Sequence, residues 1–240
     1  MPLPARLYAQ AMSPRELVYL HGFASSAQSS KGAYLAARAG EAGMGFQAPD
    51  LNDPDFATLT ISRMVEQTRR RLADGPPRPV TLIGSSLGAV VALLVGARTP
   101  DASAGAVDSL VLMAPAVDLV PGFTQHFGAE RMREWERTNR LDVYHYAEQR
   151  MRALEWGFFD DARRHDPWTI DLPVPALVFQ GSRDETVDAG AVQRWASGRA
   201  NVSLHMLEDG HQLLKSLDVM WDRIRRFLPA GAPAVDPSGA

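Results

Sequence analysis

The sequence predicts an α/β protein with a mostly parallel sheet of about six or seven strands, helices on both faces of the sheet and a short helical insertion. Three observations support this fold class. Short apolar runs alternate with helical patterns along the chain, and several of these runs are apolar nearly throughout, as in strands covered on both faces. The alternation stops in one stretch, residues 121–168. With 240 residues the chain is long enough to bury a sizeable core.

Six runs rich in Val, Ile, Leu or Phe and bounded by turn residues are expected to be strands. They span residues 16–20, 45–49, 80–84, 109–113, 176–181 and 201–207. At most one further, abbreviated strand fits before them, around residues 6–11.

Helical patterns lie between these runs, at residues 32–42, 60–73, 87–97, 189–197 and 212–227. A strand, a helix and a second strand in succession form a crossover unit whose two strands are parallel. The alternation therefore predicts a parallel sheet covered by helices on both sides. No internal repeat is visible at a period of 20–50 residues.

The expected organisation is one domain over residues 15–228, after an N-terminal segment of residues 1–14 and before a tail. The tail, residues 229–240, is rich in Pro, Gly and Ala and is expected to be disordered. The insertion at about 121–168 contains no good strand pattern, and helices are expected near 129–139 and 144–155. It also holds nine of the 19 aromatic residues.

Composition excludes several classes of protein. Apolar residues make up 45% and charged residues 22%, which is ordinary globular usage, and the net charge of −3 argues against a nucleic-acid-binding protein. The chain has no cysteine, which excludes disulfides, thiolate catalysis, zinc fingers and iron–sulfur ligation. No H-E-x-x-H spacing occurs, so we expect neither a metal nor a cofactor.

No segment has the apolar run of a secretory signal or of a bilayer-spanning helix. A cytoplasmic protein that does not bind membranes is therefore expected. The basic residues comprise 23 arginines and only two lysines, Lys31 and Lys215. This imbalance is interpreted as a coding bias and nothing more. The sequence carries no indication of the oligomeric state.

The segment from Gly84 to Gly88 joins an expected strand to an expected helix and contains the pattern G-x-S-x-G around Ser86. A serine at the tip of such a turn has a crowded backbone, and glycines two residues before and after it relieve the crowding. The amides of the following helix point to where negative charge develops on a reacting acyl group. The alternative is a glycine-rich turn used for phosphate binding or tight packing, but neither G-x-G-x-x-G nor G-K-[ST] is present.

A nucleophilic serine needs a base, and the base needs an acid that orients it. Of six histidines, His211 is the favoured base because it follows the last expected strand, on a turn that opens the final helix. Asp184 is the favoured acid because it is the first carboxylate after the fifth expected strand, and parallel sheets place their sites at such ends. Glu185 and Asp188 follow closely, and Asp118 is the fallback acid. A turn or helix-capping role is the alternative for Asp184.

The order Ser86, Asp184, His211, with Tyr19-Leu-His21-Gly22-Phe23-Ala-Ser-Ser26 after the first strand, resembles the α/β-hydrolase superfamily. The short chain and the compact His-Gly-Phe loop are most similar to small intracellular carboxylesterases and acyl thioesterases. By this resemblance, Ser86, Asp184 and His211 form the catalytic triad. The resemblance also implies an oxyanion hole made by the backbone N–H groups of Phe23 and Leu87, with the side chain of His21 bracing the loop.

The superfamily typically carries its lid where the insertion of residues 121–168 lies. The resemblance therefore implies that lid aromatic residues line the substrate site, for which the candidates are Phe123, Phe127, Tyr144 and Trp156. An equally physical alternative is that these rings only bury the insertion against the body of the protein.

The expected function is a serine carboxylesterase that acts on a small-molecule acyl ester through an acyl-enzyme. The same triad serves an acyl thioesterase or an acyltransferase, because neither the fold nor the triad decides the second substrate. A third possibility is a ligand-binding protein on a hydrolase scaffold that turns over slowly or not at all. The presence of all three triad candidates argues against it.

Overall fold

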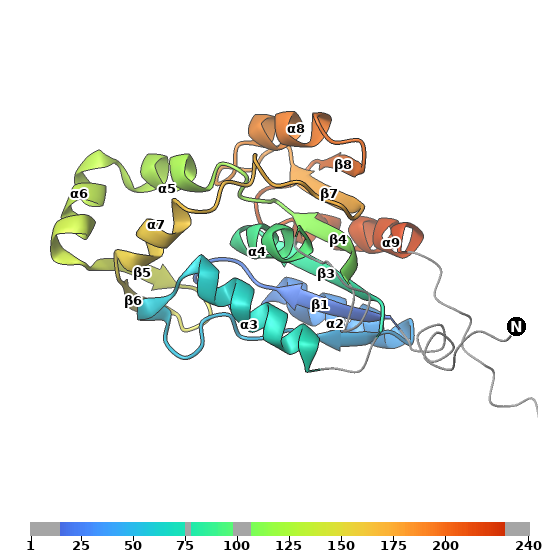
Figure 1. The fold of residues 1–240 in the computed structure, drawn as a ribbon. Coiled ribbons are helices and arrows are strands. Elements are labelled where there is room, and N and C mark those ends of the chain that lie inside the picture. The colour runs from blue at the N-terminus through green and yellow to red at the C-terminus, as the bar shows by residue number, and fades with distance from the viewer. Residues whose placement is uncertain (1–14, 75–77, 98–106, 229–240) are drawn as a thin grey trace, which may run out of the picture.

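The computed structural model describes residues 15–74, 78–97 and 107–228, and its centre is a six-stranded parallel sheet (Figure 1). The strands are β1 (Glu16–Leu20), β2 (Gly45–Gln47), β3 (Val80–Ser85), β4 (Val107–Met113), β7 (Ala176–Gly181) and β8 (Val202–Leu207), in the order β2-β1-β3-β4-β7-β8. The prediction of six parallel strands is confirmed. The possible strand near 6–11 and the tail at 229–240 lie outside the described residues.

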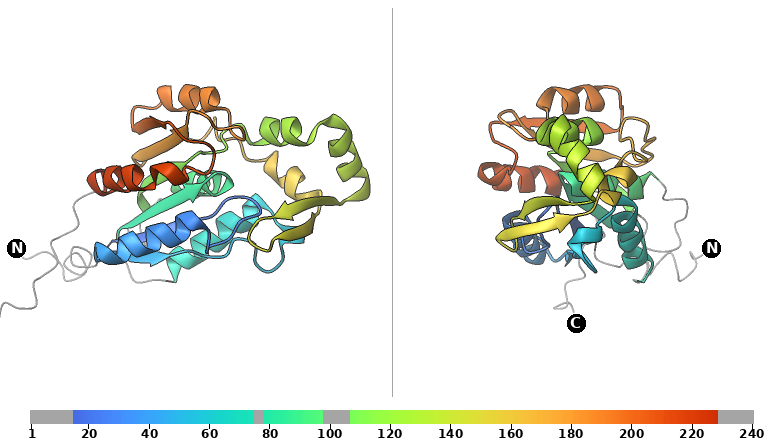
Figure 2. Two further views of the ribbon diagram at one scale, coloured as in Figure 1. Left: turned by 180° about the vertical axis from the view of Figure 1, so that it is seen from behind. Right: turned by 90° about the vertical axis from the view of Figure 1, so that its left-hand side faces the viewer.

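Helices cover both faces of the sheet because side chains alternate between the faces along each strand (Figures 1 and 2). Val18 and Leu20 of β1 belong to one core, and Leu17 and Tyr19 to the other. The first core includes residues of α3 (Ile61–Ala73), α4 (Leu87–Gly96) and α8 (Ala189–Ser197), whereas the second includes residues of α2 (Ser30–Glu41) and α9 (Leu217–Phe227). The two-sided covering predicted from the apolar strands is therefore present.

Three of these helices begin at residues that suit a helix N-terminus. Ser29, Thr60 and Asp188 precede α2, α3 and α8, and their side-chain oxygens accept hydrogen bonds from the backbone amides of the first turn. The helix expected over 212–227 starts instead with a short 3-10 turn, η2 (Leu214–Ser216), from which α9 continues. A second 3-10 turn, η1 (Phe56–Thr58), precedes α3.

The insertion differs from its prediction. It contains α5 (Leu119–Phe127), α6 (Ala129–Thr138), α7 (Gly157–Ala162) and an antiparallel hairpin of β5 (Leu141–His145) and β6 (Arg150–Leu154). The helix predicted at 144–155 is therefore wrong, as is the prediction that this stretch has no strand. In β5, buried and exposed residues alternate, so this strand buries one face only. An alternating pattern of only five residues, with no Gly in the turn that follows it, is too short to identify a strand from the sequence.

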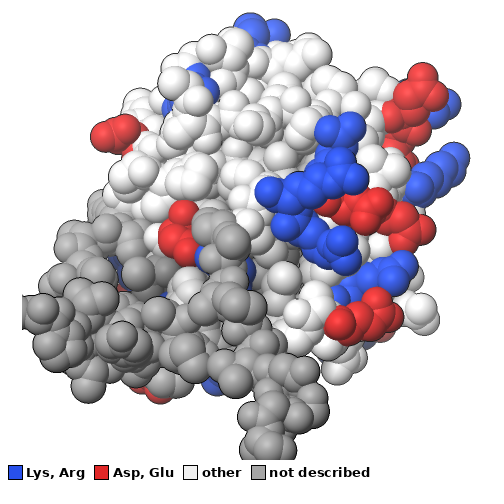
Figure 3. All heavy atoms as spheres, turned by 90° about the vertical axis from the view of Figure 1, so that its right-hand side faces the viewer, with Lys and Arg blue, Asp and Glu red and all other residues white. Residues whose placement is uncertain are grey.

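The insertion projects from the edge of the sheet at which the strands end, on the left in Figure 1. On the face seen in Figure 3, positive and negative side chains lie next to one another. Polar contacts also join α2 to α9: Asp218 accepts hydrogen bonds from the Arg38 guanidinium (3.0 Å) and the Tyr34 hydroxyl (2.6 Å). Among the described residues, no helix is long and apolar enough to cross a bilayer.

Candidate active site

Ser86 occupies a strained turn between β3 and α4. Its backbone angles are φ 54° and ψ −114°, in a region that residues with a side chain rarely adopt. The chain reverses so tightly that glycine is required on both sides. A Cβ atom on Gly84 would lie 2.4 Å from the Ala89 Cα, and one on Gly88 would lie 2.1 Å from the Leu20 carbonyl oxygen. The glycines of the motif are therefore needed for close backbone approach, and the strain falls on Ser86.

We expect Gly88→Ala to lower the free energy of unfolding by about 2–4 kcal/mol, because a methyl group there collides with the backbone of β1. Gly40→Ala is the matched control, since nothing lies within 4 Å of a Cβ atom at this position of α2. That change is expected to raise the stability by about 0.5–1 kcal/mol through the better helix propensity of alanine. Urea unfolding of both variants measures the difference, and equal effects would contradict the close approach.

The loop after β1 lies directly against this turn. A Cβ atom on Gly22 would be 3.4 Å from the Ser86 Cβ and 3.2 Å from the Ser85 carbonyl oxygen. No described residue accepts a hydrogen bond from the backbone amide of Phe23 or of Leu87, the residues that follow Gly22 and Ser86 in the chain. Two amides that have no acceptor among the described residues, one directly after the serine and one in the loop packed against it, are suited to bind an oxyanion.

Asp184 and His211 form a hydrogen-bonded pair. The His211 Nδ1 lies 2.9 Å from Oδ2 and 3.1 Å from Oδ1 of Asp184. The carboxylate is fully buried and also accepts hydrogen bonds from the amides of Thr186 and Val187. Burial raises the pKa of Asp184, but the bonds from His211 and the two amides outweigh it and hold the pKa below its usual value. Asp184 is thus ionised at neutral pH and orients the ring.

The loop that carries His211 is organised by a carboxylate that the sequence reasoning missed, Asp209. Its oxygens accept hydrogen bonds from the amides of Gly210 (2.8 Å) and Lys215 (2.9 Å) and from the Ser216 hydroxyl (3.0 Å). Burial raises the pKa of Asp209, but these bonds outweigh it and lower the pKa. Asp209 therefore closes the loop around His211.

The parallel strands bring these groups to one edge of the sheet. Ser86 follows β3, Asp184 follows β7, and His211 follows β8. Carboxyl ends of neighbouring parallel strands point the same way, so three residues from distant parts of the chain lie at the same end of the fold. A serine, an ionised carboxylate and an imidazole at one edge have the composition needed for nucleophilic catalysis.

The other candidates have other partners. Asp118, the fallback acid, accepts a hydrogen bond from the Trp168 indole at 2.8 Å. His165 contacts the Ser62 hydroxyl, and His205 contacts the Arg223 guanidinium. His21 is fully buried; its Nε2 accepts a hydrogen bond from the Leu51 amide, and its Nδ1 lies 2.9 Å from the Gly22 carbonyl oxygen. It therefore braces the loop beside Ser86.

The aromatic residues of the insertion reach the loop after β1. The ring of Phe23 packs against those of Phe56, Phe123 and Phe158 at centroid distances of 5.4–5.6 Å. Phe123 therefore packs against the side chain of the residue whose amide is one of the two candidate oxyanion donors. The ring of Phe127 in turn stacks on that of Phe123.

The other two lid candidates lie elsewhere in the insertion. Trp156 packs against Trp135 and Phe159. Tyr144 is 46% exposed and contacts the ring of Tyr146. The described contacts thus bring Phe123, of the four lid candidates, into contact with the Phe23 ring.

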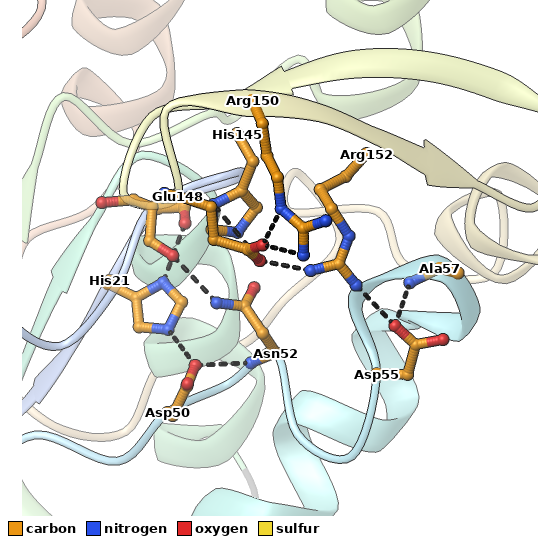
Figure 4. Close-up of polar contacts among 11 residues, drawn as sticks. His21, Asp50, Asn52, Asp55, Ala57, His145, Glu148, Arg150 and Arg152 are labelled. Carbon is orange, nitrogen blue, oxygen red and sulfur yellow. Dashed lines mark hydrogen bonds and ion pairs between the residues drawn. The ribbon is translucent and has the colours of Figure 1, made fainter.

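The hairpin is also tied to the body by polar contacts, drawn in Figure 4. Arg152 of β6 forms an ion pair with Glu148 of the hairpin turn. It forms a second ion pair, at 2.7 Å, with Asp55, which precedes η1. The Tyr146 amide donates to the Ala24 carbonyl oxygen at 2.9 Å. These contacts hold the hairpin against the loop that carries Phe23. Among the described residues, no group of three or more acidic or histidine side chains could hold a metal ion.

Comparison with known proteins identifies a family and the fold. A model of an uncharacterised protein family, UPF0227, matches residues 16–228. A protein of Agrobacterium vitis S4 that is assigned to the hydrolases superimposes with a TM-score of 0.79 at 23% identity, over 90% of this chain and 88% of that chain. Mouse alpha/beta hydrolase domain-containing protein 10 superimposes with a TM-score of 0.74 at 19% identity, over 88% of both chains.

Est1E of Butyrivibrio proteoclasticus, whose structure contains ferulic acid, gives a TM-score of 0.71 at 17% identity over 90% of this chain and 88% of that chain. Comparison with curated proteins finds no match. The structural similarities show that the chain has the α/β-hydrolase fold, as its motifs predict.

Proposed function

The chain belongs to the UPF0227 family and has the α/β-hydrolase fold, and from this premise we propose that it is a serine hydrolase that cleaves carboxylic esters. One observation carries the proposal. At the edge of the sheet where the strands end, Ser86 occupies a strained turn against which Gly22 packs, and the Asp184–His211 pair follows two other strands at the same edge. Strained backbone at a reactive group is characteristic of functional sites.

In the proposed mechanism, the Ser86 Oγ attacks the acyl carbon of the ester while the Nε2 of His211 takes its proton. Asp184 holds Nδ1 and so keeps Nε2 free as the acceptor. The amides of Phe23 and Leu87 donate to the oxyanion of the tetrahedral intermediate. His211 then protonates the leaving alcohol, and an acyl-enzyme remains. A water molecule, deprotonated by His211, releases the carboxylic acid and restores Ser86.

A hydrolysis panel tests the proposal. Nitrophenyl esters of increasing acyl length and a matching acyl-CoA series are offered to the purified protein, and a fluorophosphonate probe reports the nucleophile directly. We expect ester hydrolysis and labelling of Ser86. Failure of the probe to label Ser86, with no hydrolysis of any substrate, would refute the proposal and favour a ligand-binding protein on a hydrolase scaffold.

The same panel distinguishes the alternative of an acyl thioesterase or an acyltransferase. A thioesterase would prefer the acyl-CoA series over the nitrophenyl esters. An acyltransferase would form a new ester when an alcohol is added, which product analysis detects. The contacts of the site favour neither the thioesterase nor the acyltransferase, because the triad does not determine which molecule accepts the acyl group.

The contact between Phe123 and Phe23 leads to a prediction about substrate selection. We expect Phe123→Ala to lower kcat/KM for long or aromatic acyl groups by roughly tenfold and for acetyl esters much less, because it removes an apolar ring that packs on Phe23, a proposed oxyanion residue. Tyr144→Ala is the comparison variant, since this ring is half exposed and contacts Tyr146. Equal losses on all acyl lengths would mean that Phe123 only packs the insertion.

A further inference from the structure

Gln180 is a fully buried amide near the end of β7, in the strand that leads to Asp184. Side chains alternate between the two faces of a strand, and Ala176 and Val178 belong to the first core, that of α3, α4 and α8. The side chain of Gln180 therefore lies on the face of that apolar core. A polar group in such a place destabilises a protein unless its hydrogen bonds are satisfied.

The amide nitrogen of Gln180 donates to the proposed acid. Its Nε2 lies 2.9 Å from Oδ2 of Asp184 and 3.2 Å from the Gly181 carbonyl oxygen. Both partners are acceptors, so their chemistry assigns the nitrogen to this position. With the amide turned over, Oε1 would face two oxygen atoms. A hydrogen bond therefore joins a buried amide to a buried carboxylate.

The oxygen of the same amide is not satisfied in this way. The buried Oε1 of Gln180 accepts no hydrogen bond from any described residue. A buried carbonyl group without a partner costs about 1–3 kcal/mol, and an apolar side chain of similar size would avoid this cost. Stability alone therefore does not account for glutamine at this position. The bond to Asp184 is a reason that no apolar residue could supply.

The two oxygens of the Asp184 carboxylate are held by different donors. Oδ1 accepts hydrogen bonds from the backbone amides of Thr186 (2.8 Å) and Val187 (2.9 Å), which belong to the same loop. Oδ2 is the oxygen closer to the His211 Nδ1, at 2.9 Å, and its second donor is the Gln180 amide. Gln180 thus holds the oxygen through which Asp184 orients the base. Without it, the carboxylate is less restrained from turning about its bond to Cβ.

The loop that carries His211 lies on the same end of β7. A Cβ atom on Gly181 would be 2.5 Å from the Asp209 carbonyl oxygen, which also accepts a hydrogen bond from the Arg183 amide at 3.0 Å. The backbone therefore holds the loops of the acid and the base against each other. The side chain of Gln180 adds the direction of the carboxylate, which the backbone contacts do not determine.

We propose that Gln180 is a positioning residue of the candidate site: its amide donates to Oδ2 of Asp184 and holds the carboxylate in the orientation in which it binds Nδ1 of His211. This inference rests on the proposed function. Because Gln180 is fully buried, it acts through Asp184 and does not touch substrate. Its loss should therefore slow the reaction of bound substrate and leave substrate binding unchanged.

The first test replaces the amide by an apolar chain of similar length. In Gln180→Met we expect kcat for the best nitrophenyl ester to fall about 10–100-fold, with KM within about twofold of the wild type. Thermal unfolding checks that the variant is folded. An unchanged kcat in a folded Gln180→Met protein would overturn the inference, as would an equal loss that appears in KM.

Gln67→Met is the matched control for this test. The Gln67 Nε2 donates to the Asp53 carbonyl oxygen at 2.7 Å, and its buried Oε1 also has no partner among the described residues, but it lies in α3 and contacts no member of the triad. Both kcat and KM should stay within about twofold of the wild type. A loss of kcat as large as in Gln180→Met would assign the effect to packing and overturn the inference.

The second test asks whether the effect of Gln180 passes through Asp184. Gln180→Met is made in the wild type and in the Asp184→Asn variant, and the rate of fluorophosphonate labelling of Ser86 is measured in all four proteins. We expect the change to cost about 10–100-fold in the wild type and less than about threefold in Asp184→Asn. The same loss in both backgrounds would mean that Gln180 only packs the end of the strand, and it would overturn the inference.

A third measurement leaves Gln180 unchanged. In protein with isotope-labelled glutamine, NMR follows the side-chain amide groups, and that of Gln180 should exchange its hydrogens slowly because it is fully buried. We expect a slowly exchanging amide signal to move in Asp184→Asn and to stay in place in Asp118→Asn. If no such signal moved in Asp184→Asn, the hydrogen bond would be absent and the inference overturned, even if Gln180→Met did not fold.

These experiments distinguish failure of this inference from failure of the proposed function. Labelling of Ser86 at the same rate in the wild type and in Gln180→Met would overturn the role of Gln180 and leave the hydrolase proposal intact. No labelling of the wild type, together with no hydrolysis of any substrate, would overturn the proposed function and the role of Gln180 with it.

Discussion

The Ser86→Ala protein is expected to fold like the wild type and to lose turnover by a factor of about 10⁴–10⁶. The loss is this large because the proposed reaction has no other group to form the acyl-enzyme. Folding is expected to be preserved, since alanine at φ 54° carries the same backbone strain as serine. Steady-state hydrolysis of the best nitrophenyl ester, with circular dichroism and thermal unfolding alongside, measures both effects.

Ser85→Ala is the matched control for this experiment. Ser85 precedes the proposed nucleophile but is buried at the end of β3, where its hydroxyl interacts with that of Tyr19. We expect this variant to keep its activity within a few-fold of the wild type. A folded Ser86→Ala protein with undiminished turnover, or a Ser85→Ala protein that alone is inactive, would show that the nucleophile is misassigned.

Asp184→Asn is expected to lower kcat by about 10⁴. The asparagine oxygen still accepts the amide hydrogen bonds of Thr186 and Val187, so the loop after β7 keeps its structure. However, the asparagine amide group donates a hydrogen bond and favours the tautomer of His211 in which Nε2 carries the proton. The imidazole is then unable to take the proton of Ser86. Hydrolysis kinetics with a stability control measure this loss.

The fallback acid supplies the comparison for this prediction. Asp118→Asn still offers an oxygen to the Trp168 indole, so both activity and folding should be close to those of the wild type. Loss of activity in Asp118→Asn with retention in Asp184→Asn would assign the acid to the loop after β4. Equal retention in both variants would mean that neither carboxylate orients the base.

Much of the fold could be predicted because its signals are local. The apolar runs that form β1 and β7 are bounded by turn residues, and both strands begin and end where the sequence predicts. The hairpin of the insertion was missed because β5 buries only one face and both strands depend on contacts with distant residues. Arg152 pairs with Asp55, and Phe56 contacts His145 of β5, partners almost one hundred residues apart in sequence. No short window of sequence contains this information.

The sequence by itself determined the strand–helix alternation and the motif around Ser86, because both follow from residue types at short spacing. Only the tertiary structure decided that Asp184, and not Asp118, binds the ring of His211. It also decided that Asp209, which no motif indicates, accepts the hydrogen bonds that close the loop around His211. The reason is physical: hydrogen bonds such as that between Asp184 and His211 join groups from different parts of the fold, and they exist only once the parallel strands have brought those groups to one edge.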